Sequence, residues 1–256
     1  MDQETAIQEA ARRIAASRYC TALVGAGMSK ESGIPTFRGE GGLWTRLGEP
    51  PMNGYQLFLE DPRAWWLERL EQQRNPPEFA RAITDATPNP GHHALADLEQ
   101  RGYLKHLITQ NVDGLHLDAG STAITEIHGN RRKLRCIACG RRGPTRDFVE
   151  DDVPPVCDRC GGVVKADTVM FGEPIPPAFL ASCHEHAGRS DLMLVIGTSA
   201  TVYPAADFPM QVLRRGGAII EVNVDETLFT PYAAVALRGP SGELLPRLVE
   251  ALQDDT

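Results

Sequence analysis

Four cysteines in two pairs are the clearest chemical signal in the sequence. Residues 140–156 separate Cys136-x-x-Cys139 from Cys157-x-x-Cys160, a spacing typical of a zinc site. Each pair places two thiolates on one side of a tight turn, and two such turns complete a tetrahedron. Because four thiolates leave no position for water, we expect a structural zinc ion. A redox-active dithiol, the alternative, would not require two pairs at this distance.

His128, which precedes Gly129, is a candidate for proton transfer. The imidazole group changes charge near neutral pH, so a histidine can act as a general base. The chain contains 7 histidines, and the residue type alone is therefore weak evidence. The prediction is strengthened by the position of His128 directly before the cysteine-rich segment.

Glycine-rich or polar segments directly follow four apolar stretches. In an open α/β sheet, the carboxyl ends of the strands line the ligand crevice, where polar groups bind sugars and glycines let the backbone approach a phosphate. The first two segments could equally be ordinary turns or helix caps, and Lys30 replaces the third glycine of the dinucleotide-binding motif. The four segments are Gly25-Ala26-Gly27, Thr109–His116, Gly197-Thr198-Ser199 and Asn223-Val224-Asp225.

Hydrophobic periodicity indicates the elements that would position these residues. Strands are predicted over 21–24, 104–109, 192–196 and 218–222. Helices are predicted over 4–17, 63–74, 78–86, 92–101, 178–188, 205–215 and 244–252. Apolar strands alternating with helices indicate an α/β fold with a parallel sheet covered on both faces. Residues 39–62 are expected to form loops with short helical pieces, and residues 131–165 a small module held by metal.

Composition excludes several classes of protein. The chain has 256 residues, of which 42% are hydrophobic and 23% are charged, as in ordinary globular proteins. No apolar run is long enough to span a membrane, and the first residues do not form a secretory signal. A net charge of −8 argues against direct nucleic-acid binding. Paired cysteines without an export signal favour a reducing, cytoplasmic location.

The order of these motifs resembles that of the sirtuins, from about residue 20 to residue 250. The segments that carry the resemblance are Gly25-Ala26-Gly27-Met28-Ser29-Lys30-Glu31-Ser32-Gly33-Ile34-Pro35-Thr36-Phe37-Arg38, Thr109–His116, His128-Gly129, the cysteine pairs, Phe171-Gly172-Glu173, Gly197-Thr198-Ser199 and Asn223-Val224-Asp225. The resemblance implies an NAD-dependent protein-lysine deacylase of the prokaryotic single-core type. Its products would be nicotinamide, free lysine and 2′-O-acyl-ADP-ribose.

The resemblance also implies two domains with a cleft between them. Residues 1–38, 91–130 and 166–256 would form a Rossmann-like, NAD-binding domain. The helical insert, residues 39–90, and the zinc ribbon, residues 131–165, would form the small domain. NAD and an acyl-lysine peptide would meet in the cleft.

Residue roles follow from the same resemblance. His128 would be the general base, with Asn111 and Asp113 as further catalytic residues, and Phe37 would shield the reacting ribose from water. One structural zinc would be held by Cys136, Cys139, Cys157 and Cys160. Peptide would pair as an added strand with Val169, Met170, Phe171, Gly172, Val202 and Tyr203. NAD would contact Gly25, Ala26, Gly27, Thr36, Phe37, Arg38, Trp44, Gln110, Asn111, Val112, Asp113, Gly197, Thr198, Ser199, Asn223, Val224 and Asp225.

A few positions depart from the family pattern. Val112 replaces the commoner isoleucine, and Ala166 a frequent proline. Sirtuins that prefer succinyl- or malonyl-lysine carry Tyr-x-x-Arg in the insert, where the nearest match here is Trp66 with Arg69. Because an indole N–H can only donate a hydrogen bond, we expect acetyl or another uncharged acyl group.

Two other functions remain open from the sequence. One is protein mono-ADP-ribosylation from the same NAD site. The other is a non-catalytic NAD sensor or zinc-ribbon adaptor, which the retained Asn111, Asp113 and His128 disfavour. The sequence does not indicate an oligomeric state.

Overall fold

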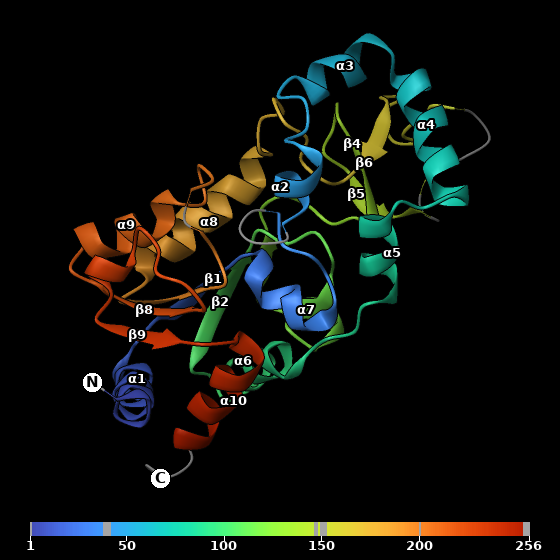
Figure 1. The fold of residues 1–256 in the computed structure, drawn as a ribbon. Coiled ribbons are helices and arrows are strands. Elements are labelled where there is room, and N and C mark those ends of the chain that lie inside the picture. The colour runs from blue at the N-terminus through green and yellow to red at the C-terminus, as the bar shows by residue number, and fades with distance from the viewer. Residues whose placement is uncertain (1, 38–41, 146–147, 149–152, 200, 253–256) are drawn as a thin grey trace.

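Two sheets form the framework of the molecule (Figure 1). The computed structural model describes residues 2–37, 42–145, 148, 153–199 and 201–252. The larger sheet has six strands in the order β3-β2-β1-β7-β8-β9, and all of its neighbouring strands are parallel. Counted along the chain, this order is 3-2-1-4-5-6, which is that of doubly wound dinucleotide-binding folds. The predicted Rossmann-like α/β fold is thereby confirmed.

Short apolar segments form the strands of this sheet. The strands are β1 (Cys20–Val24), β2 (Leu104–Thr109), β3 (Ile124–Glu126), β7 (Leu192–Ile196), β8 (Ala218–Asn223) and β9 (Val235–Arg238). The strands β1, β2, β7 and β8 match the predicted ones within a residue. The sequence does not predict the edge strands β3 and β9, because β3 is only 3 residues long and β9 only 4.

Helices cover both faces of the larger sheet, as predicted (Figure 1). One face packs against α1 (Gln3–Ala16), α6 (Pro90–Gln100) and α10 (Ser241–Ala251), and the other packs against α8 (Pro177–Arg189) and α9 (Asp207–Arg214). Neighbouring residues of one strand enter opposite cores, as Val24 and Leu23 do in β1, because side chains alternate across a strand.

Helix α6 begins two residues earlier than predicted. The side chain of Asn89 accepts hydrogen bonds from the backbone N–H groups of Gly91 and His92. Pro90 occupies the first turn, where the missing N–H costs nothing. The Pro-Asn-Pro-Gly sequence, which looks like a simple break, therefore starts the helix.

The helical insert and the zinc ribbon lie together at the upper right of Figure 1. The insert contains α2 (Leu43–Leu47), α3 (Gly54–Glu60), α4 (Pro62–Arg74) and α5 (Glu78–Asp85), and the ribbon is an antiparallel sheet of β4 (Lys133–Cys136), β5 (Arg142–Pro144) and β6 (Val164–Ala166). Trp66 of α4 packs with Leu134 and Val164 of the ribbon. Its indole N–H donates to the Val164 carbonyl over 2.8 Å. The two segments therefore share one core.

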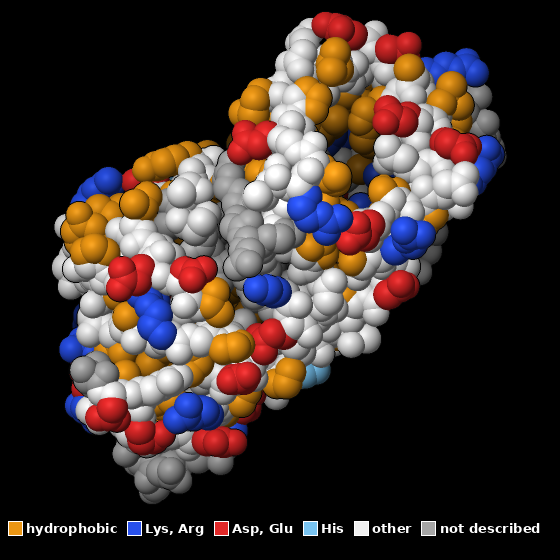
Figure 2. All heavy atoms as spheres, viewed as in Figure 1, with side chains coloured by type: hydrophobic (Ala, Val, Ile, Leu, Met, Phe, Trp, Pro, Cys, Tyr) orange, Lys and Arg blue, Asp and Glu red, His pale blue; other side chains and the backbone are white. Residues whose placement is uncertain are grey.

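The surface of the insert carries exposed apolar side chains. Figure 2 shows them gathered over α3 and α4, where Met52, Leu57, Leu59 and Leu67 are exposed. Within the described residues, no helix has the length and apolar character needed to cross a membrane.

Candidate active site

The loops after β1 and β7 meet where the strand order of the sheet reverses. Gly25 N–H donates to the Ile196 carbonyl over 2.9 Å, and Gly27 N–H donates to the Gly197 carbonyl over 2.8 Å. A Cβ atom on Gly27 would lie only 2.8 Å from Gly197 Cα. The glycines are thus required for the approach of one loop to the other. In doubly wound folds, this reversal point is where ligands bind.

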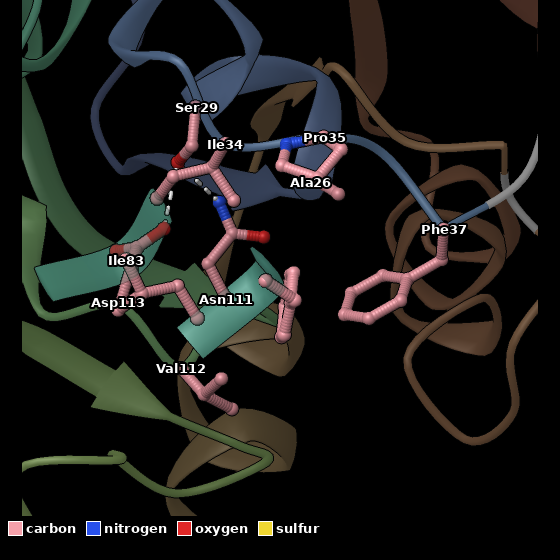
Figure 3. A pocket seen from close by; sticks show the side chains of 10 residues that line it. Ala26, Ser29, Ile34, Pro35, Phe37, Ile83, Asn111, Val112 and Asp113 are labelled. Carbon is pink, nitrogen blue, oxygen red and sulfur yellow. Dashed lines mark hydrogen bonds between the residues drawn. The ribbon is translucent and has the colours of Figure 1, made fainter. Parts of the chain in front are cut away.

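The 3₁₀ helix η1 (Ala26–Ser32) follows β1 and contributes to a polar cluster of three side chains. Asn111 Nδ2 donates to Ser29 Oγ and to the Gly25 carbonyl, each over 3.1 Å. The Ser29 hydroxyl donates to Asp113 Oδ2 over 2.7 Å. These bonds fix the amide so that, in Figure 3, the oxygen of Asn111 points away from Ser29 toward the open side of the pocket. We call Ser29, Asn111 and Asp113 the polar cluster.

Asp113 is 4% exposed, and its other oxygen accepts the backbone N–H of Leu115 over 2.9 Å. This bond starts the short helix α7 (Leu115–Asp118). Burial raises the pKa of Asp113, while the bonds from Leu115 and Ser29 lower it in part. Asp113 therefore combines a capping role with a polar side chain at the base of the pocket.

His128 lies just beyond β3, next to the end of β2. Its Nδ1 is 3.1 Å from the carbonyl oxygen of Gln110. A carbonyl oxygen can only accept, so Nδ1 carries the hydrogen and Nε2 is left with its lone pair. Burial lowers the pKa of His128, partly offset by the bond to Gln110. The side chain is accordingly a neutral imidazole at neutral pH, as a general base must be.

Hydrogen bonds connect the residues at the carboxyl ends of β2, β7 and β8, beyond the reversal point. Gln110 Nε2 donates to the Thr198 hydroxyl over 3.0 Å, and Asn223 Nδ2 donates to the Thr198 carbonyl over 3.1 Å. Ser199 bonds to Thr201. The structure thus brings the predicted residues of β2, β7 and β8 together, whereas Val224 and Asp225 lie on the exposed surface beyond them.

A cluster of aromatic rings closes one side of the pocket. The ring centroid of Phe37 lies 4.9 Å from Trp44 and 5.3 Å from Phe79, and Trp44 lies 5.5 Å from Phe171. Backbone bonds from Leu43 to Thr36 and from Trp44 to Phe37 fix this turn. The pocket is lined by Ala26, Ser29, Ile34, Pro35, Phe37, Phe79, Ile83, Asn111, Val112 and Asp113 (Figure 3). Arg38 lies outside the described residues.

Of the two segments predicted to pair with peptide, one lies directly beside His128. Val169 N–H donates to the His128 carbonyl over 2.8 Å, and the Phe171 carbonyl accepts from Tyr55 N–H over 2.9 Å. Val202 and Tyr203 belong to the turn before α9, and Tyr203 is 75% exposed.

The four cysteines of the ribbon fit a zinc ion. Their sulfur atoms all lie within 4.8 Å of one another, with Cys136 and Cys160 3.5 Å apart and Cys139 and Cys157 3.8 Å apart. Sulfur atoms bound at about 2.3 Å in a tetrahedron are separated by about 3.8 Å. The geometry and the soft thiolate donors thus both suit a structural zinc.

Some residues of the site have no predicted role. Ser29 lies inside the glycine segment, but its bonds to Asn111 and Asp113 depend on strands that are far apart in the sequence. Phe79 and Ile83 of α5 line the pocket, and the sequence indicates only that their helix is amphipathic.

Together, the strand order, the polar cluster at the reversal point and the four-cysteine ribbon are those of a nucleotide-binding α/β protein with a site suited to zinc. The model of the Sir2 family matches residues 25–204. An NAD-dependent protein deacylase 2 of Pyrobaculum aerophilum is 43% identical over 240 residues, which cover 94% of this chain and 93% of that protein. The chain therefore belongs to the Sir2 family, the sirtuins, as its motifs indicate.

Solved structures of the family share the whole fold. A Sir2 homolog–NAD complex is 42% identical with a TM-score of 0.79, and the match covers 97% of this chain and 94% of that one. A Sir2–p53 peptide–NAD+ complex is 32% identical with a TM-score of 0.76, and the match covers 95% and 97% of the two chains.

Proposed function

We propose that this protein is an NAD-dependent protein-lysine deacylase that acts on acetyl-lysine. The observation that carries the proposal is the convergence of Asn111, Asp113 and a neutral His128 at the reversal point of the sheet. The relatives named deacylases and the neighbours that hold NAD and peptide support the same function. NAD is a substrate in this reaction, and the zinc of the ribbon is structural.

The proposed roles follow from the position of each group. NAD supplies an electrophilic ribose carbon, which the acyl oxygen of the substrate attacks as nicotinamide leaves; the lysine amine leaves when the acyl group passes to the ribose hydroxyl. The free amide oxygen of Asn111 and the carboxylate of Asp113 orient the nicotinamide and its ribose. Phe37 excludes water from the ribose, and His128 Nε2 accepts the proton of a ribose hydroxyl when that hydroxyl attacks the acyl carbon. The glycine loops and Thr198 contact the phosphates, and Asn223 the adenosine ribose.

An uncharged acyl group is favoured by the placement of Trp66. The indole is 3% exposed, and its N–H is used by the Val164 carbonyl, so it offers nothing to an acyl carboxylate. The Arg69 guanidinium lies 5.7 Å from the centroids of both Trp65 and Trp66. Held against these rings, Arg69 supports the core of the insert.

The remaining assignments concern organisation and location. We propose the Rossmann-like domain of residues 1–38, 91–130 and 166–256 and the small domain of residues 39–90 and 131–165, supported by the core that insert and ribbon share. Ribbon thiolates require reducing conditions, which supports a cytoplasmic location. The net charge of −8 supports a protein or peptide partner without direct nucleic-acid contact.

Mass spectrometry tests the function directly. One peptide bearing acetyl-, butyryl- or succinyl-lysine is incubated with the protein, with and without NAD. We expect NAD-dependent loss of the acyl mass, with acyl-ADP-ribose as product and acetyl preferred over succinyl. ADP-ribose attached to protein would instead indicate a transferase, and unchanged peptide with intact NAD would contradict both.

A further inference from the structure

The segment before α8 folds around a buried lysine. The Lys165 side chain is 0% exposed. Its ammonium group donates to the carbonyl oxygens of Ala166 and Thr168, each over 2.7 Å, and lies 2.9 Å from Glu173 Oε2. A buried charge is tolerated only when it is paired and hydrogen-bonded, and here all three ammonium hydrogens have a partner.

Glu173 connects this lysine to the predicted peptide segment and to the ribbon. Its Oε2 also accepts the backbone N–H of Met170 over 2.9 Å, and its Oε1 accepts from Arg135 Nη2 of β4 over 2.7 Å. The side chain of Glu173 is 3% exposed. One buried carboxylate thus holds the backbone of residues 170–173 in a closed turn.

The same segment is anchored to the loop between β3 and β4, which carries the candidate base, and to β4 itself. Asp167 accepts from the backbone N–H of Asn130 over 2.7 Å and from Arg135 Nε over 3.2 Å. Two residues later, Val169 N–H donates to the His128 carbonyl. Residues 165–173 are consequently placed relative to His128 by charged groups that do not line the nucleotide pocket.

We propose that Lys165 and Glu173 are positioning residues, which hold the backbone of residues 169–172 in the shape that pairs with the substrate peptide. The inference rests on the proposed function, in which this segment binds peptide. Neither side chain lines the nucleotide pocket. Their loss acts on peptide binding through the loop and leaves the NAD site at the reversal point intact.

The test uses the variants Lys165→Met, Glu173→Gln and their combination in the full chain, with Glu4→Gln as a control. Glu4 forms an exposed pair with Arg247, with exposed fractions of 65% and 44%. Steady-state kinetics give KM for an acetyl-lysine peptide and for NAD. Fluorescence anisotropy gives the peptide Kd, calorimetry gives the ADP-ribose Kd, and thermal unfolding gives Tm.

We expect Lys165→Met to raise the peptide KM about tenfold, because it leaves two carbonyls and a buried carboxylate with fewer partners. The NAD KM and the ADP-ribose Kd should stay within about twofold of the wild type. Glu173→Gln keeps a carbonyl oxygen for Met170 but leaves the buried Lys165 charge without its carboxylate, so it should raise the peptide KM by a similar factor. The double variant should bind peptide no worse than Lys165→Met, because the buried carboxylate is then neutralised. Glu4→Gln should change neither the peptide KM nor the NAD KM.

A merely structural role predicts a different pattern. A lower Tm with an unchanged peptide KM in both single variants would overturn the proposal, as would an equal rise in both KM values. If the wild type binds peptide but does not turn it over, the proposed function fails, and the peptide Kd of the variants still decides the inference. If the wild type binds no peptide at all, both fail.

Discussion

Gly129, the residue after His128, allows a close contact that a single methyl group should destroy. Its φ angle is +79°, and an added Cβ would overlap the carbonyl oxygen of Asp167 and lie 2.7 Å from the carbonyl carbon. Asp167 cannot yield easily, because Arg135 and Arg142 hold its carboxylate. Gly129→Ala therefore tests whether the backbone of Asp167 must contact the turn that carries His128.

Two effects contribute to the loss of stability expected for Gly129→Ala. A positive φ costs a residue with a side chain about 1–2 kcal/mol. Overpacking in a well-packed region adds about 1–3 kcal/mol. We expect Gly129→Ala to lower the free energy of unfolding by about 2–5 kcal/mol, a large part of the stability of an ordinary domain. Turnover should fall as well, since relief of the overlap displaces His128.

Urea denaturation and peptide turnover check this prediction, with Gly188→Ala as the matched control. A Cβ on Gly188, in α8, would meet nothing within 4 Å, so the control should gain about 0.5–1 kcal/mol. The reasoning is refuted if Gly129→Ala unfolds within about 0.5 kcal/mol of the wild type.

Three further predictions concern His128, the four-cysteine ribbon and His92 of α6. His128→Ala should reduce turnover at least about 100-fold while the ADP-ribose Kd is unchanged, and, because burial lowers the pKa of His128, the acidic limb of kcat/KM for the wild type should have its midpoint below 6.5. A limb centred above 6.5 would contradict the assignment of His128 as a half-buried neutral base. Chelation of zinc should lower Tm and activity together, and full activity after stoichiometric metal loss would rule out the structural role. Burial lowers the pKa of His92 to about 4, so below pH 6.5 the unfolded state binds a proton that the folded state does not. His92 alone should therefore lower the unfolding free energy by about 2 kcal/mol between pH 7 and pH 5, and His92→Gln should make the total fall seen in urea titrations smaller by about that amount. An identical pH dependence in the variant would refute the assignment.

The central strands and the zinc site could be predicted from short stretches of the sequence. The apolar runs at β1, β2, β7 and β8 stand out because parallel strands are buried on both faces. The zinc site was predictable because both turns keep their ligands within a short stretch of chain. The edge strands β3 and β9 carry weaker patterns, and their pairing depends on neighbours that only the folded sheet supplies.

The chemistry of the site was predictable only in part. The sequence pattern placed Asn111 and Asp113 at the end of a strand and His128 directly before the cysteine-rich segment, and the family resemblance supplied their roles. The protonated nitrogen of His128 depends on the Gln110 carbonyl, which no spacing rule indicates. The same holds for Lys165, because a single charged residue in a short strand would ordinarily be assigned to the surface.

The indole of Trp66 has a consequence for chimeric enzymes. Trp66 of α4 packs against Val164 of β6 and donates its N–H to the Val164 carbonyl. If the ribbon alone came from a relative, the indole could lose both this packing and its hydrogen-bond acceptor. The insert transplanted alone would leave the Val164 carbonyl without its donor. The two segments, although β2 and β3 of the larger sheet lie between them along the chain, should be exchanged as one cassette. Exchanging both together should preserve expression where either single exchange impairs it.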